Sequence, residues 1–446
     1  MRIVAYETCM TNGNRLAELP MMETEPENLR EEKQMLNIYD DMTYQTIDGF
    51  GGALTEAGAV NLSRMPEALR GKVMRAYFDP REGLGLNFCR THINSCDFCL
   101  RNYSFDDTPE DFALAHFDFS YERQTLMPFL KEALRLNPAL WLYASPWSPP
   151  AWMKTTGSMT GGGKLRRECY DVWARYVARY LEEYRREGVP FWGVTIQNES
   201  NYPAQWDSCL YSAEDERDFI RCFLGPTLVQ RGLGDTRILY WDHNKERILD
   251  RAESTLSDPG AAQYIYGTAY HWYSGDHFDA LRMTHERFPE KRLYATENGI
   301  GRGTDYPWAL GERVAHGIIG DMNHYANGFT LWNLLLDEEG GPSYSLKNGR
   351  APMMMNFKSG ELTIGSAYEY LGHFSKFVHR GAVRLGVSRF DASLELAAFR
   401  NPDGQTVAVV LNRNDEEQPF WLRRGGQVAR IIAKAHSVLT LCFEGE

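Results

Sequence analysis

Short apolar runs alternate with amphipathic segments along most of the chain, and two of these runs end in a carboxylate. Residues 191–200 (FWGVTIQNES) are apolar and β-branched up to Ile196 and then turn polar. The run is too short for a helix, and Gly188-Val189-Pro190 ends the preceding one. We therefore predict a buried strand with Glu199 at its carboxyl end. Residues 292–299 (RLYATENG) have the same form and place Glu297 at a second strand end.

The alternation of strand-like and helix-like segments repeats eight times. Helical periodicity is evident in residues 61–78, 121–136, 170–186 and 308–324. Eight such repeats predict a (β/α)8 barrel, with a doubly wound sheet as the alternative. The predicted strands are residues 46–52, 86–93, 140–144, 192–197, 237–241, 264–271, 292–296 and 328–333.

Both ends of the chain lack this alternation. Residues 3–8 and 35–39 are strand-like and have no partner helix, while short alternating runs with an Asp403-Gly404 hairpin turn follow the last helix at residues 366–377. We predict that the two ends together build a smaller β-sandwich beside the barrel. The expected organisation is residues 1–44 and 378–446 in the side domain and 45–377 in the barrel.

Composition and charge argue against a nucleic-acid-binding, membrane-spanning or secreted protein. The chain has 446 residues, 43% of them hydrophobic, and a net charge of −12, which argues against a nucleic-acid partner. No secretory signal and no apolar run of membrane-spanning length are evident. We therefore expect a cytoplasmic protein whose eight cysteines are thiols. Composition leaves the oligomeric state open.

Glu199 and Glu297 have the form of a catalytic pair. Glycoside hydrolysis needs one carboxyl group to protonate the leaving oxygen and a second to attack the anomeric carbon or activate water. The alternative is that both are solvated loop residues. Aromatic side chains recur near the predicted strand ends, where they suit the C–H faces of a sugar, although aromatics also dominate cores. They are Trp147, Trp206, Trp241, His271, Trp272, Tyr273 and Trp332.

Cys96 and Cys99 have the C-x-x-C spacing of redox and zinc sites. A single pair without a second pair is a weak signal for either, so we expect no metal here.

Several stretches together resemble glycoside hydrolase family 30, the glucosylceramidase-like retaining β-glycosidases. The resemblance implies a (β/α)8 barrel with a side β-domain built from both chain ends, and catalysis without metal or organic cofactor. The matching stretches are QTIDGFGGALTEA (45–57), NSCDFCLRNYSFDDTPEDF (94–112), YASPWSPPAWMKTTGSMTGGGKL (143–165), QNES (197–200), YHWY (270–273), ATENG (295–299), LWNLLLDEEGGPSY (331–344) and YLGHFSKF (370–377).

The resemblance also implies roles for single residues. Glu199 corresponds to the general acid/base and Glu297 to the nucleophile. Arg90 and Tyr273 correspond to groups that hydrogen-bond the nucleophile, which would keep Glu297 ionised while Glu199 holds its proton. Asn348 is a looser match, because its loop aligns poorly. The implied sugar-binding residues are Asp97, Trp147, Asn198, His271, Tyr273, Trp332 and Asn348.

The expected activity is hydrolysis of terminal β-D-glucosidic bonds by double displacement on a carbohydrate substrate. The resemblance leaves β-xylosidase, β-fucosidase and β-1,6-glucanase activities open as alternatives. Transglycosylation and an inactive sugar-binding protein are the more distant ones.

Overall fold

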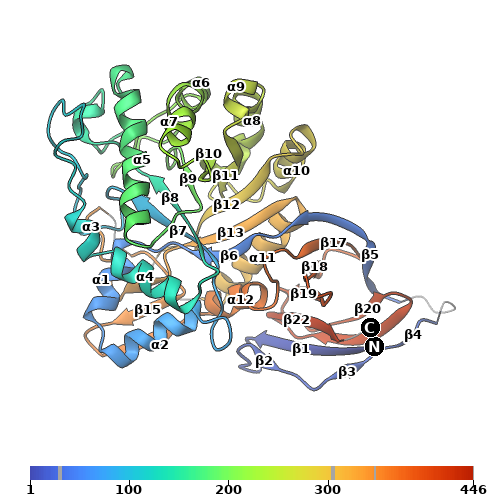
Figure 1. Ribbon diagram of the computed structural model, residues 1–446. Coiled ribbons are helices and arrows are strands. Elements are labelled where there is room, and N and C mark those ends of the chain that lie inside the picture. The colour runs from blue at the N-terminus through green and yellow to red at the C-terminus, as the bar shows by residue number, and fades with distance from the viewer. Residues whose placement is uncertain (29–32, 303–306, 346–347, 445–446) are drawn as a thin grey trace.

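Eight parallel strands form a barrel in the computed structural model, which describes all residues except 29–32, 303–306, 346–347 and 445–446 (Figure 1). They hydrogen-bond in the order β6-β13-β12-β11-β10-β9-β8-β7, and a single bridge between Ala53 and Arg90 links the two ends. The prediction of a (β/α)8 barrel is confirmed, and the doubly wound alternative is wrong. The strands are β6 (Gly49–Gly52), β7 (Phe88–Ile93), β8 (Trp141–Pro146), β9 (Gly193–Thr195), β10 (Arg237–Asn244), β11 (Ile265–His271), β12 (Arg292–Gly299) and β13 (Ala326–Trp332).

Helices surround the barrel, and two of the predicted helices are divided. Residues 61–78 are not one helix, because the chain is extended at Met65 and a second helix starts after Pro66. Proline lacks an N–H and disfavours a helical residue before it. Residues 121–136 likewise divide at Thr125 and Leu126. The helices are α1 (Glu56–Arg64), α2 (Glu67–Phe78), α3 (Ser120–Gln124), α4 (Met127–Leu136), α5 (Tyr170–Arg186), α6 (Ala213–Phe219), α7 (Gly225–Gln230), α8 (Ile248–Leu256), α9 (Pro259–Ala262), α10 (Phe278–Arg287), α11 (Ala309–Asn323) and α12 (Ser366–Ser375).

Both chain ends build the side β-domain, as predicted (Figure 1). The first strand pairs antiparallel with the last along its whole length, from Arg2 opposite Glu444 to Cys9 opposite Ser437. Strand β20 was not predicted, because Pro419 interrupts its apolar run. The strands are β1 (Arg2–Cys9), β2 (Ala17–Glu18), β3 (Met22–Glu23), β4 (Glu25–Pro26), β5 (Met35–Thr46), β17 (Val383–Arg389), β18 (Glu395–Arg400), β19 (Thr406–Asn412), β20 (Gln418–Arg424), β21 (Gln427–Ala433) and β22 (Ser437–Glu444).

Aromatic rings fill the barrel interior beneath the carboxyl ends of its strands. Phe88 stacks on Tyr143 and Tyr294, with ring centroids 4.8 and 5.3 Å apart. These rings make the barrel a packed core and leave its upper mouth as the place for a site. A small additional sheet, β14 (Leu335–Asp337), β15 (Met353–Asn356) and β16 (Glu361–Ile364), follows β13. Within the described residues, none of the helices has the length and apolarity needed to cross a membrane.

Candidate active site

Glu199 and Glu297 face each other at the mouth of the barrel. One carboxylate oxygen of each, together with a ring nitrogen of His271, lies within 4.8 Å of the others. Backbone hydrogen bonds fix the turn after β9, since Asn198 N–H donates to Pro146 and Glu199 N–H donates to Asp242. Glu199 adopts a left-handed backbone conformation with φ of 48°. The two strand-end glutamates therefore form a pair.

Both oxygens of the Glu297 carboxylate accept hydrogen bonds from neighbouring strand ends. The hydroxyl of Tyr273 donates to Oε1 at 2.8 Å, and Nη1 of Arg90 donates to Oε2. Arg90 is fully buried and also donates from Nη2 to Oδ1 of Asn198 at 2.9 Å. The contacts of Arg90 and Tyr273 with Glu297 are those that the resemblance implied.

Asp242 in β10 connects the two halves of the site, and the sequence did not reveal it. Its carboxylate accepts hydrogen bonds from Arg90 at 2.7 Å and from Nε2 of His271 at 3.0 Å. The hydroxyls of Thr195 and Thr296 each donate to it at 2.6 Å. Burial by itself would raise the pKa of Asp242, but Arg90 and these hydrogen bonds hold it well below its usual range.

A bulge in β10 explains why Asp242 points into the site. The register with β11 shifts between Trp241 and His243, and Asp242 itself has φ of 52°. Bulges of this kind re-aim a side chain next to an active site. In the sequence, Asp242 follows an apolar strand as Glu199 and Glu297 do, and that shared pattern was the available signal.

His271 links Asp242 to Glu199. Its Nδ1 lies 3.4 Å from Oε1 of Glu199, while Nε2 donates to Asp242. Burial would lower the pKa of His271, but Glu297 and the hydrogen bonds to Asp242 and Glu199 raise it to about 9. His271 in turn lowers the pKa of Glu199 against the effect of burial, and burial raises the pKa of Glu297 although His271 and Arg90 oppose it.

These directions differ from the expectation of an ionised Glu297 beside a protonated Glu199. The reason is that a proton can occupy either His271 or Glu199 without changing the total charge of the network. With an imidazolium, Glu199 is ionised; with a neutral imidazole, Glu199 is the acid. The two forms differ by transfer of one proton between Nδ1 and Oε1, so the proton belongs to the His271–Glu199 pair.

A cavity of about 450 Å³ opens above the two glutamates. Trp147 and Trp332 stack with centroids 5.3 Å apart, and the Arg90 guanidinium lies 4.7 Å from the Trp147 ring. Asp97 is 5% exposed, its Oδ1 has no hydrogen-bond partner, and burial raises its pKa well above the usual range. An unpaired acceptor beside an indole suits a ring that carries hydroxyls.

Two of the residues implied to bind the sugar, His271 and Asn348, do not line this cavity. Asn348 is exposed and does not line it, whereas its neighbours Gly349 and Arg350 do. Several other lining residues were not predicted; some lie on loops without a regular pattern, whereas His243 and Asn244 end β10 and Arg313 lies in α11. They are Tyr202, His243, Asn244, Arg302, Arg313, Asn333 and Arg350.

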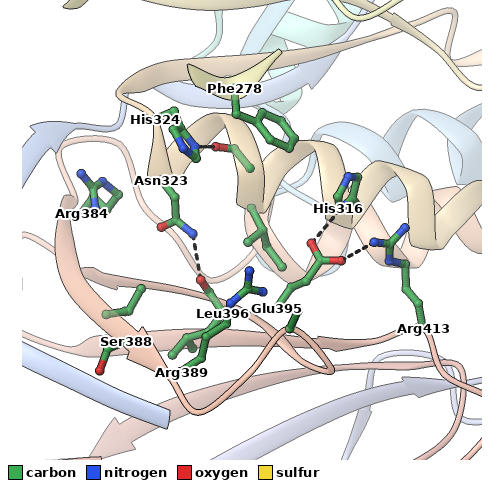
Figure 2. Close-up of a pocket in the computed structure, with 14 residues that line it drawn as sticks. Phe278, His316, Asn323, His324, Arg384, Ser388, Arg389, Glu395, Leu396 and Arg413 are labelled. Carbon is green, nitrogen blue, oxygen red and sulfur yellow. Dashed lines mark hydrogen bonds and ion pairs between the residues drawn. The ribbon is translucent and has the colours of Figure 1, made fainter. Parts of the chain in front are cut away.

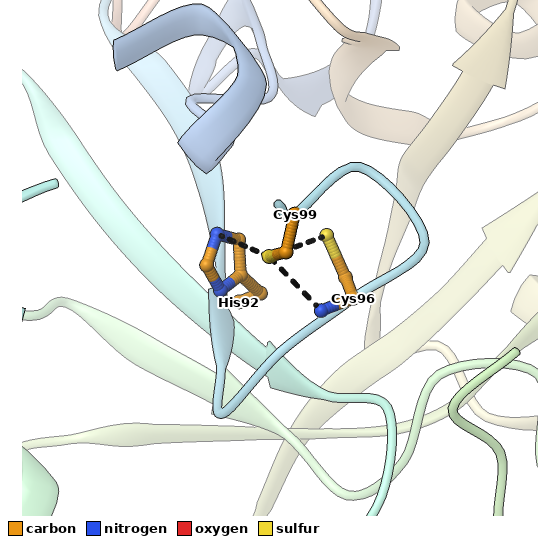
Figure 3. A group of neighbouring side chains, drawn as sticks. All are labelled: His92, Cys96 and Cys99. Carbon is orange, nitrogen blue, oxygen red and sulfur yellow. Dashed lines mark hydrogen bonds between the residues drawn. The ribbon is translucent and has the colours of Figure 1, made fainter. Parts of the chain in front are cut away.

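Cys96 and Cys99 are buried beside His92 (Figure 3). The two sulfurs are 3.8 Å apart, and Cys99 Sγ is 3.8 Å from Nε2 of His92. These three atoms are close enough to hold a soft metal ion. Nε2, however, accepts the backbone N–H of Glu56 at 3.2 Å, and burial raises the pKa of Cys96 to about 11. The contacts are those of neutral thiols beside a neutral imidazole.

Comparison with known proteins agrees with this arrangement. The chain is 35% identical to the lysosomal acid glucosylceramidase of Mus musculus over 414 residues, which cover 87% of this chain and 79% of that protein. It is 30% identical to the endo-1,6-beta-D-glucanase of Neurospora crassa over 417 residues, which cover 89% and 85%. The crystal structure of SrfJ from Salmonella typhimurium superposes with a TM-score of 0.97 at 34% identity and covers 100% of both chains.

Two domain families match the two parts of the fold. Residues 47–378 match the glycosyl hydrolase family 30 TIM-barrel domain, and residues 381–441 match the beta sandwich domain of the same family. The resemblance noted in the sequence is confirmed. The chain therefore belongs to glycosyl hydrolase family 30 and is a glycoside hydrolase.

Proposed function

We propose that the protein is a retaining β-glycosidase that releases terminal β-D-glucose. The observation that carries this proposal is the separation of the glutamates, whose nearest carboxylate oxygens lie within 4.8 Å. Retaining enzymes hold the two carboxyl groups about 5 to 5.5 Å apart, whereas inverting enzymes need about 6.5 to 9.5 Å to admit a water. The short gap supports direct attack by one carboxylate.

In the first step, Glu297 attacks the anomeric carbon and Glu199 protonates the leaving oxygen. Arg90 and Tyr273 hold the Glu297 carboxylate in one orientation through its two oxygens. In the second step, Glu199 takes a proton from the water that releases the sugar. Glu199 draws its first proton from the pair that it forms with His271, so Asp242 acts indirectly by orienting His271.

The cavity suits a single hexose as the glycone. Trp147 and Trp332 supply apolar faces, and Asp97 accepts hydrogen bonds from sugar hydroxyls. Asn198 Oδ1 is occupied by Arg90, which leaves its Nδ2 to donate to a hydroxyl. Glucose is favoured because relatives at 33–36% identity are named glucosylceramidases. The endo-1,6-beta-D-glucanase relative at 30% identity supports an alternative, attack on β-1,6-glucan.

The test is hydrolysis of p-nitrophenyl β-glucoside, β-xyloside, β-fucoside and β-galactoside by the wild type and Glu297→Gln. We expect glucoside turnover in the wild type, its loss in the variant, and β-glucose as the first product by ¹H NMR. α-Glucose as the first product would contradict retention. Turnover of β-1,6-glucan without turnover of the aryl glucoside would favour the alternative.

We also propose that the enzyme works in a reducing compartment, in accord with the expected cytoplasmic location. The support is that all eight cysteines are free thiols in the fold.

A further inference from the structure

A second cavity of about 450 Å³ lies between the barrel and the side β-domain (Figure 2). Helix α11 forms one wall, and strands β17 and β18 form the other. It shares no lining residue with the catalytic cavity. Interfaces between domains are frequent places for small-molecule sites. Its lining includes charged, polar and aromatic side chains, namely Arg384, Arg389, Arg413, Glu395, Asn323 and Phe278.

Arg384 is a buried cation held rigidly at this cavity. It is 5% exposed, and its guanidinium lies 3.7 Å from the ring of Tyr44 and 5.4 Å from that of Tyr325. Its Nε donates to Oε1 of Gln45 at 3.0 Å. Gln45 is itself fixed by hydrogen bonds to the backbone of Met322 and Ala326. Elements of both domains therefore set the orientation of the guanidinium.

Arg384 has no counter-charge among the described residues. No carboxylate lies within ion-pair distance, and neither Nη has an acceptor in the described chain. Arg90, also buried, pairs with Asp242 and Glu297, and Arg380 donates to three backbone carbonyls. Burial lowers the pKa of Arg384 to about 10. A desolvated cation of this kind is costly unless an anion joins it.

The rest of the lining is also cationic and partly apolar. Arg389 is exposed at the rim and donates only to the Leu394 carbonyl among the described residues. Arg413 lies 2.7 Å from Glu395, which is the only acidic residue that lines the cavity in the described chain. Three arginines face one glutamate in a protein whose net charge is −12. The lining therefore attracts anions although the protein as a whole repels them.

Asn323 provides a hydrogen-bond acceptor that lacks a donor within the described chain. Its Nδ2 donates to the Leu396 carbonyl at 2.9 Å, while its buried Oδ1 has no hydrogen-bond partner. An unpaired acceptor is satisfied by a ligand that carries a hydroxyl donor. Phe278 and the aliphatic side chains of α11 and β17 provide apolar contact for the body of such a ligand.

We propose that this cavity binds a small hydroxylated organic anion, with Arg384 holding its anionic group and Asn323 accepting from a hydroxyl. A carboxylate and a phosphate ester share this chemistry, so a sugar acid and a sugar phosphate are both suitable ligands. The proposal is independent of the roles of Glu199 and Glu297, and its test does not depend on glycosidase activity.

The test is isothermal titration calorimetry with glucuronate, with glucose 6-phosphate and with neutral glucose. Low ionic strength and a buffer without phosphate avoid competition by other anions. We expect at least one of the two anions to bind in a way that depends on Arg384, whereas glucose, which also fits the catalytic cavity, should bind equally to the wild type and to Arg384→Met. Arg384→Met should weaken binding of that anion about tenfold or more, because it removes charge-assisted hydrogen bonds. Arg430→Met is the matched control, since it removes the same charge from an exposed position outside the cavity and should leave binding unchanged.

Two results would overturn the proposal: no binding of either anion, or anion binding that is unchanged in Arg384→Met. If Arg384→Met does not fold, Arg389→Met at the exposed rim replaces it. Weaker anion binding by Arg389→Met than by Arg430→Met would support the proposal that the cavity binds an anion. Equal binding by the two variants would overturn the proposal. Comparing the two anions then identifies whether a carboxylate or a phosphate is preferred.

Discussion

Nδ1 of His271 lies 3.4 Å from Oε1 of Glu199, so these two residues can share one proton, which the proposed first step of glycoside hydrolysis consumes. The pair holds this proton more tightly than Glu199 would alone, because the proton has two sites and Asp242 stabilises one of them. The proton is present below the pKa of the pair and is lost as the pH rises through it. His271 is the site with the higher pKa, which Glu297 and the hydrogen bonds to Asp242 and Glu199 raise to about 9.

Replacing His271 by Gln should therefore move the basic limb of the kcat/KM profile to lower pH. In the wild type we expect this limb near pH 9. In His271→Gln the proton resides on Glu199 alone, so it is lost at lower pH. His243→Gln is the control, because burial lowers the pKa of His243 to about 4 and it carries no proton to lose in this range. An unmoved limb in His271→Gln would contradict the shared proton.

Glu199→Gln should separate the two chemical steps. With a poor leaving group, turnover should fall by about 10² to 10⁴, the usual contribution of a general acid. With a good leaving group such as 2,4-dinitrophenolate, the first step needs little protonation and the covalent intermediate should accumulate. Added azide should then restore turnover and give the β-glucosyl azide, measured by ¹H NMR. β-Glucosyl azide from Glu297→Gln instead would reverse the assignment of the two glutamates, whereas α-glucosyl azide from that variant would agree with Glu297 as the nucleophile.

Asp242→Asn should destabilise the protein strongly. The change leaves Arg90 without one carboxylate partner in a fully buried position and weakens the support of His271. Breaking a buried ion pair costs about 3 to 5 kcal/mol in the free energy of unfolding. Urea denaturation at neutral pH measures this loss. Asp235→Asn is the control, because its ion pair with Arg185 is exposed and should contribute less than about 1 kcal/mol.

Native thiol reactivity should report a single accessible cysteine. Cys222 is exposed, and the other seven cysteines are buried. Ellman's reagent should therefore label one thiol rapidly in the folded protein and all eight after denaturation without reductant. A count of six after denaturation would indicate one disulfide, and peptide mapping would show whether Cys96 and Cys99 form it.

The pattern of apolar runs was sufficient to predict the barrel and to place Glu199 and Glu297 at its mouth. Strands β9 and β12 are buried on both faces, so their sequences are continuously apolar, and the polar residues that end them mark the barrel mouth. The prediction that both chain ends build the side domain followed from the strand-like segments at each end, which have no partner helix. The division between α1 and α2 was missed because helical periodicity continues across Met65-Pro66 although the backbone does not.

Asp242 shows what a periodic pattern cannot supply. Its direction depends on a bulge in β10, and a one-residue register shift leaves no mark in the hydrophobic pattern. Other lining residues, such as Tyr202, Arg302 and Arg350, lie on loops, whose paths are set by tertiary packing. Asn348 illustrates the same difficulty, since the loop carries its neighbours into the lining and leaves Asn348 exposed.

The pairing of β1 with β22 bears on the order in which the two domains fold during synthesis. Before β22 is made, β1 can pair only with the short strands β2 and β3, whereas β22 pairs with every residue from Arg2 to Cys9. The barrel strands are complete well before that, and domains generally fold as units during synthesis. We therefore expect the barrel to fold before β22 is made. The side domain is completed only when β22 has been translated and pairs with β1.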